Sequence, residues 1–179
     1  SLLSQIIVDK FLYHLPEYRQ AKRFKELGVE ISTSSMNRWV HATADKLYGL
    51  YAAQMERVLS AGYIQVDETT HPITDRPGSA RKGYIWVVRS VLVPGVFFYY
   101  DKGSRSGEVV LKMLKGYQGA LQTDGYAAYS IFEEKKGVLP LGCMAHVRRK
   151  FENALTTTPE AKPALDYIAL LYMLEGNLR

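Results

Sequence analysis

Hydrophobic residues in the first third of the chain recur at the three-and-four spacing of amphipathic helices. Residues 2–15 form the first such run, and a proline ends it. A second helix is predicted over residues 17–27, where Gly28 supplies a left-handed stop. A third, long helix follows a serine-rich segment that offers N-caps, and it extends to Leu59. Residues 1–59 are therefore predicted as a small all-α region whose last helix connects to a second domain.

From Gly62 onward the hydrophobic period falls to two, which is typical of β-strands. Residues 70–82 combine prolines with mixed charge and are predicted as a loop. The predicted strands are residues 63–67, 84–91, 96–100, 119–123 and 138–141. The predicted helices are residues 107–115, 126–133, 144–155 and 159–179.

This order of three strands, helix, strand, helix, strand and helix predicts the fold class. A hairpin set joined through a helix to parallel strands gives an α/β fold with a mixed five-stranded sheet and helices on both faces. The arrangement is ribonuclease-H-like. Residues 60–179 are predicted to form this domain.

Composition narrows the class of protein. The 179 residues are 47% hydrophobic and 23% charged, which excludes wholesale disorder and collagen-like repeats. A single cysteine rules out an intramolecular disulfide, and the early charge at the N-terminus argues against a secretory signal. No uncharged apolar run approaches the roughly 18 residues of a membrane helix. We therefore expect a cytoplasmic protein without a membrane partner, and its net charge of +5 is compatible with an anionic partner.

Two aspartates close predicted strands that the fold would place side by side. Asp67 ends the first strand and Asp124 ends the fourth, which lies beside the first in a ribonuclease-H-like sheet, about 4.8 Å away. Such carboxylates repel each other unless a cation lies between them, and hard oxygen ligands favour Mg²⁺ or Mn²⁺. A metal site of this kind serves in-line displacement at phosphorus. The alternative is that Asp124-Gly125 only forms a turn and that Glu68-Thr69 continues an edge strand.

Clusters of basic residues predict contacts with DNA phosphates. One cluster lies on the helix after the fifth strand, at the sheet edge where the two aspartates are expected. The others lie before the second strand, on the second helix, and at the start of the third helix, where Asn and Arg suit base edges. The alternative for each cluster is a solvated face or ordinary helix packing. The predicted DNA-binding residues are Arg148, Arg149 and Lys150, Arg81 and Lys82, Arg19, Lys22 and Arg23, and Asn37 and Arg38.

Cys143 and His146 have the spacing of two ligands of one metal ion. Structural zinc needs four ligands, and the sequence offers no second pair of this kind. We therefore interpret Cys143 as a buried thiol at a strand end and His146 as a residue that opens a helix. The alternative for His146 is a place near the acidic centre, where it would position the DNA substrate.

The chain resembles the IS66 family of bacterial insertion-sequence transposases in four stretches that occur in the family's order. They are residues 64–69 (IQVDET), 83–87 (GYIWV), 121–129 (LQTDGYAAY) and 142–151 (GCMAHVRRKF). Upstream, residues 14–20 and 28–40 resemble the family's helix-turn-helix segment. The resemblance implies a DDE transposase with a ribonuclease-H-like catalytic core and with Asp67 and Asp124 as the first two acids. It also implies Mg²⁺ or Mn²⁺ as cofactor, the DNA of transposon ends as partner, and the bacterial cytoplasm at the nucleoid as location. A homo-oligomer is left open.

The family's third acid is a glutamate in an Asn-Asn-x-x-Glu-Arg-like segment, and a cysteine-rich region precedes its helix-turn-helix. This sequence contains neither, so we expect a fragment truncated at the C-terminus and inactive alone. Glu175, on the last predicted helix, is the candidate third catalytic carboxylate, and the alternative is an ordinary solvent-facing glutamate. The predicted function is metal-dependent DNA strand cleavage and transfer during transposition. Two alternatives stay open: a catalytically inactive DNA-binding or assembly module, and a nuclease that only hydrolyses.

Overall fold

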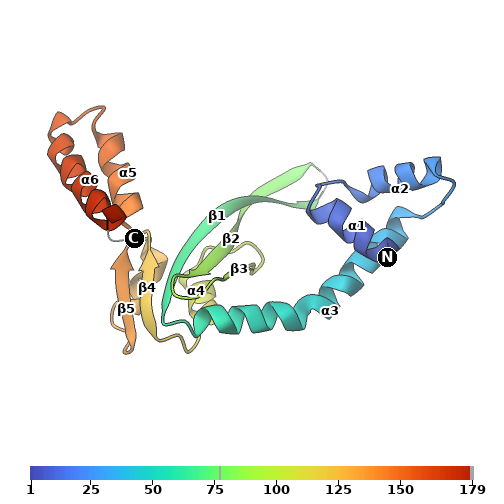
Figure 1. Ribbon diagram of the computed structural model, residues 1–179, viewed down its shortest axis with the longest axis horizontal. Coiled ribbons are helices and arrows are strands. Elements are labelled where there is room, and N and C mark those ends of the chain that lie inside the picture. Colours follow the sequence, from blue (N-terminus) through green and yellow to red (C-terminus); the bar gives the residue numbers. More distant parts are fainter. Residues whose placement is uncertain (77, 178–179) are drawn as a thin grey trace. The chain divides into compact units, whose positions relative to one another are not determined.

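The computed structural model describes residues 1–76 and 78–177 (Figure 1). The chain divides into two compact units, Ser1–Ala53 and Gln54–Arg179. The boundary lies within the long helix α3 (Thr33–Leu59).

Unit 1 consists of three helices around a small core. α1 (Leu2–Phe11) and α2 (Glu17–Glu26) pack with the first turns of α3. Ile6, Met36 and Val40 form the buried centre of this core, and each is at most 7% exposed. The predicted helices are therefore present, because their hydrophobic stripes converge on one apolar cluster.

Two buried polar side chains of unit 1, Gln20 and Asp9, form hydrogen bonds or an ion pair with other residues of the unit. The amide nitrogen of Gln20 donates to the carbonyl of Leu15 at 2.9 Å, which ties α2 to the segment that connects it with α1. The buried carboxylate of Asp9 accepts a hydrogen bond from Gln5 at 2.7 Å and forms an ion pair with Arg23. Arg23 therefore joins α2 to α1, besides lying on the helix predicted to contact DNA.

Unit 2 is built on a five-stranded sheet in the order β3-β2-β1-β4-β5 (Figure 1). Its strands are β1 (Tyr63–Arg76), β2 (Ser79–Ser90), β3 (Val96–Tyr99), β4 (Gly119–Thr123) and β5 (Val138–Gly142). Its helices are α4 (Gly107–Met113), η1 (Ala127–Phe132), α5 (Met144–Ala154), η2 (Pro159–Ala161) and α6 (Lys162–Asn177).

The sheet is mixed, as the element order predicts. β1 pairs antiparallel with β2, and β2 pairs antiparallel with β3. β4 pairs parallel with β1 on one side and with β5 on the other. The α/β prediction, with N-terminal helices followed by a mixed five-stranded sheet and helices, is therefore confirmed, and the fourth strand lies beside the first.

One face of the sheet carries the hydrophobic core of unit 2. Val66 on β1 and Val88 on β2 are opposite each other, and both are buried. Trp86 lies on the same face and meets the ring of Tyr129 edge-on, with centroids 6.0 Å apart, so η1 packs against this face. The alternating positions, such as Asp67, belong to the opposite face, where a pocket opens.

The predicted loop over residues 70–82 is wrong, because β1 and β2 continue through it as a two-stranded hairpin (Figure 1). Thr70 pairs with Tyr84 and Pro72 pairs with Lys82. β4 pairs with β1 only as far as Gln65, so β1 is an edge strand beyond that point. A proline, which lacks an N–H donor, is tolerated in an edge strand.

Across the described part of the chain, no helix is both long and apolar enough to cross a membrane.

Candidate active site

Strand pairing brings the two predicted catalytic aspartates to one place. Gln65 on β1 pairs with Gln122 on β4, and the strands run parallel. The same register, if continued two residues beyond the last pair, sets Asp67 opposite Asp124, and both aspartates line one pocket. Because side chains two residues apart point to the same face of a sheet, both carboxylates face the side opposite the hydrophobic core.

A cavity of about 240 Å³ opens on that face and contains both aspartates in its lining. β1, β2 and β4 of the sheet, together with the start of α5, supply its lining. The lining residues are Gln65, Val66, Asp67, Val87, Arg89, Gln122, Thr123, Asp124, Cys143 and His146.

The carboxylate of Asp67 is accessible from solvent. Its side chain is 57% exposed, and its Oδ1 accepts the backbone N–H of Glu68 at 2.9 Å. The Nε2 atom of His146 lies 3.8 Å from Oδ2 of Asp67. The carboxylate therefore has free lone pairs on the pocket side, next to an imidazole.

The carboxylate of Asp124 is held by the turn that follows β4. Its Oδ1 accepts the backbone N–H of Tyr126 at 2.8 Å, and the backbone N–H of Gly125 donates to the hydroxyl of Thr123 at 3.2 Å. Gly125 adopts a φ of +79°, which glycine reaches without strain. The Asp-Gly pair thus forms the turn that the alternative interpretation expected, and it also presents the carboxylate to the pocket.

β5 and α5 place His146 beside Asp67. The backbone N–H of Cys143 donates to the carbonyl of Thr123 at 2.8 Å, which fixes the start of α5 against the end of β4. His146 lies in the first turn of α5. Its Nδ1 is buried and has no hydrogen-bond partner among the residues that the structure describes. His146 thus opens a helix, as the first interpretation has it, and also lies beside Asp67, as the alternative has it.

Two glutamines that line the pocket, Gln65 and Gln122, are not among the site residues predicted from the sequence. The amide nitrogen of Gln65 donates to Oε1 of Gln122 at 2.7 Å, and the hydroxyl of Tyr63 donates to the same oxygen at 3.1 Å. Each glutamine lies two residues before a catalytic candidate, and that spacing in a strand was the available indication that they share its face.

The donor set fits one hard divalent cation. Mg²⁺ prefers oxygen ligands and is commonly bound by one or two carboxylates that leave room for water and substrate phosphate. Asp67 and Asp124 offer this set in a cavity of adequate size. Within residues 1–76 and 78–177, no group of three or more His, Cys, Asp or Glu side chains is arranged to enclose a metal ion.

Glu175 is not among the residues that line the pocket. It lies in the last turns of α6, and its side chain is exposed. α5 and α6 form a helical hairpin in which α6 runs back toward the sheet (Figure 1). The predicted third carboxylate is therefore not among the residues that surround the aspartate pair.

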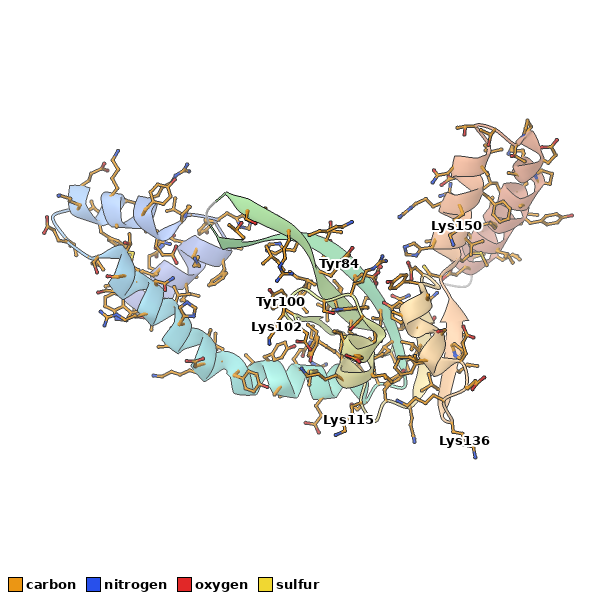
Figure 2. The ribbon with its side chains drawn as sticks, turned by 180° about the vertical axis from the view of Figure 1, so that it is seen from behind. Tyr84, Tyr100, Lys102, Lys115, Lys136 and Lys150 are labelled. Carbon is orange, nitrogen blue, oxygen red and sulfur yellow. The ribbon has the colours of Figure 1, made fainter. Side chains whose placement is uncertain are left out.

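The basic residues predicted on α5 are exposed, and Figure 2 shows Lys150 on this helix. Arg148 pairs with Glu152 one turn later at 2.8 Å, whereas Arg149 and Lys150 are exposed beside it. α5 starts at the pocket through His146, so its cations are close in sequence to the aspartate pair.

The remaining predicted DNA contacts do not line the pocket. Arg81 and Lys82 lie on the β1–β2 hairpin, where Arg81 donates to the carbonyl of Lys102 at 3.2 Å. Four others are exposed in unit 1, and Arg38 at the start of α3 donates to the hydroxyl of Ser35 at 3.3 Å. These four are Arg19 and Lys22 on α2, and Asn37 and Arg38 on α3.

Comparisons with known proteins add an independent result. The sequence model of the Transposase IS66 family matches residues 1–179. The uncharacterized protein y4jD of Sinorhizobium fredii is 32% identical over the whole chain, and the uncharacterized protein y4qI of the same organism is 34% identical over 99% of it. The chain spans 38% and 36% of the length of these two relatives. No solved structure matches the chain.

Proposed function

Because this chain belongs to the transposase IS66 family, we propose that it carries catalytic residues of a DNA transposase that cleaves and transfers DNA strands. The observation that carries the proposal is the pair of carboxylates, Asp67 and Asp124, on adjacent parallel strands in one open pocket. The strand order supports a ribonuclease-H-like core. Such a protein acts on the DNA of transposon ends in the bacterial cytoplasm, at the nucleoid.

Asp67 and Asp124 would hold Mg²⁺ or Mn²⁺ through their pocket-side oxygens. The cation supplies Lewis-acid polarisation of the scissile phosphodiester and lowers the pKa of the attacking hydroxyl. Nε2 of His146 lies 3.8 Å from Oδ2 of Asp67, so the imidazole would limit the directions in which that carboxylate turns.

The cations of the chain would hold the DNA. Arg149 and Lys150 on α5 extend from the helix that begins at the pocket, so they would meet the phosphates that flank the scissile bond. In unit 1, the exposed Asn37 and Arg38 would contact base edges from the start of α3, as the recognition helix of a helix-turn-helix does.

A titration with Mn²⁺ tests the shared site. Asp67→Asn and Asp124→Asn each remove one of two negative charges, so each variant should bind Mn²⁺ at least about tenfold more weakly than the unmodified chain. Asp45→Asn, at an exposed position of α3, is the matched control and should bind as the parent does. Unchanged affinity in either pocket variant would contradict the shared site.

A second candidate function is a catalytically inactive DNA-binding or assembly module derived from a transposase. It is favoured because, in the part of the chain that the structure describes, no group of three or more His, Cys, Asp or Glu side chains is arranged to hold a metal ion. DNA binding by a chain that binds no Mn²⁺ would support this function instead of the first.

A further inference from the structure

On the face opposite the pocket, two side chains converge on the carboxylate of Glu68. This carboxylate is 2% exposed. The Nε of Arg105 donates to its Oε1 at 2.6 Å, a terminal nitrogen of Arg105 contacts the same oxygen, and the hydroxyl of Tyr129 donates to Oε2 at 3.1 Å. A buried carboxylate is thus satisfied from both sides, by residues of two other segments.

Arg105 also stacks on aromatic rings. Its guanidinium carbon lies 3.7 Å from the ring centroid of Tyr126 and 5.2 Å from that of Tyr84, a residue of β2 labelled in Figure 2. Burial lowers the pKa of Arg105, but the hydrogen bonds and charge of Glu68 outweigh it, so the pKa is raised and the cation is retained. A planar guanidinium can bind a carboxylate through its edge and a ring through its face, which an ammonium cannot do.

The two residues that Arg105 holds are the ones whose backbone fixes the pocket aspartates. The N–H of Glu68 donates to Asp67, and the N–H of Tyr126 donates to Asp124. Pairing between β1 and β4 ends at Gln65 and Gln122, two residues before the aspartates, so no hydrogen bond of this ladder joins the strands at Asp67 and Asp124 themselves. Arg105 spans this gap from the other side of the sheet.

We propose that Arg105 is a positioning residue that sets Asp67 and Asp124 relative to each other, through Glu68 on one side and Tyr126 on the other. The inference rests on the proposed function for its role in metal binding. The geometry itself can be tested without a metal. If Arg105 only stabilised the fold, its ion pair with Glu68 would be sufficient. Arg105 instead contacts both Glu68 and Tyr126, whose backbone N–H groups bind the two pocket carboxylates.

The test uses Arg105→Lys, which keeps the charge and loses both the fork and the stacking surface. Mn²⁺ affinity should fall about 10- to 100-fold, as it does when groups that orient metal ligands are lost. Without metal, amide hydrogen exchange measured by NMR should become faster at Glu68 and Tyr126 together, while exchange at Ile64 stays as in the parent. Lys112→Ala, which removes the ion pair of Lys112 with Asp101, is the control and should change neither measurement.

Parent-like Mn²⁺ affinity and amide protection in a folded Arg105→Lys variant would overturn the proposal. If that variant does not fold, Tyr126→Leu removes the stacking partner and leaves the ion pair with Glu68. It should weaken Mn²⁺ binding and accelerate exchange of the backbone amide at position 126, and parent-like behaviour would again overturn the proposal. If the parent chain binds no Mn²⁺ but the two amides still respond together to Arg105→Lys, the positioning role stands and the proposed metal site fails.

Discussion

Replacing Asp67 by asparagine should stabilise unit 2 in the absence of metal and destabilise it, relative to the parent, in the presence of Mn²⁺. The substitution removes one negative charge and little else. Asparagine has nearly the same shape as aspartate, and its side-chain oxygen can still accept the N–H of Glu68, which is 2.9 Å from Asp67. The change in stability therefore measures the electrostatic interaction between the two pocket carboxylates.

The magnitude follows from the register and the exposure. Asp67 and Asp124 are separated by roughly one strand spacing or somewhat more, about 5–8 Å. Asp67 is 57% exposed, so a water-like dielectric constant applies, and the repulsion is about 0.5–1 kcal/mol. Mn²⁺ at about 100 times its dissociation constant stabilises the parent by about 2.7 kcal/mol and the variant by much less. The order of stability therefore reverses when metal is added.

The two tryptophans of the chain make the assay specific for one unit. Trp86 is fully buried in unit 2, and Trp39 lies in unit 1. In a Trp39→Phe background, urea unfolding followed by fluorescence reports unit 2 alone. It should be run with EDTA and with Mn²⁺ at about pH 8, where free imidazole is uncharged.

Lower stability of Asp67→Asn in EDTA would refute the repulsion argument, because it would show that the carboxylate stabilises the metal-free fold. Equal Mn²⁺ stabilisation of parent and variant would refute a role of Asp67 as ligand. Asp45→Asn is again the control. It removes a charge from the other unit and should leave the unfolding of unit 2 unchanged under both conditions.

Three further predictions concern other parts of the chain. Gly119→Ala should destabilise unit 2 by about 2–4 kcal/mol in urea unfolding, because Gly119 has a φ of +127° and an added Cβ would meet a backbone oxygen at 2.2 Å. Changing Arg149 and Lys150 together to glutamine should reduce the salt dependence of duplex binding, measured by fluorescence anisotropy, by about 0.9 in slope per lost phosphate contact, and an unchanged slope would contradict the contact. The hydrogen bond from Lys10 lowers the pKa of Glu17, so Glu17→Gln should destabilise unit 1 at neutral pH, and the difference should vanish as the pH falls through the folded-state pKa of Glu17; a difference that persists in acid would contradict this cause.

The placement of Asp67 beside Asp124 could be predicted from sequence because it depends on two robust features. One is the order of strands and helices, which fixes β4 next to β1 through a crossover helix. The other is the two-residue period of strands, which determines the face of each side chain once the register is known. Neither feature requires side-chain detail. The β1–β2 hairpin was missed for the opposite reason, since Pro72 is compatible with a strand only where the other edge is unpaired.

Arg105 was missed because nothing local marks it. It is a single arginine in the segment between β3 and α4, and its three partners come from three other segments. The two-residue period of strands places Glu68 on the face opposite Asp67, but the sequence does not show that the carboxylate is buried or which cation neutralises it. Contacts between single side chains that are distant in the sequence leave no periodic pattern in it, so only the folded structure reveals them.

Two adjacent residues of β1 therefore lie on opposite faces of the sheet beside the same pocket. Asp67 faces the pocket, and Glu68, the next residue, faces the core, where Arg105 neutralises it. An ion pair with one buried partner adds little net stability, because the cost of removing the charge of Glu68 from water offsets its attraction to Arg105. Its position next to the pocket carboxylate is thus better explained by the orientation it imposes than by the stability it adds. On this proposal, a change of side chain on the core face of β1 would move the backbone N–H that holds the carboxylate on the pocket face.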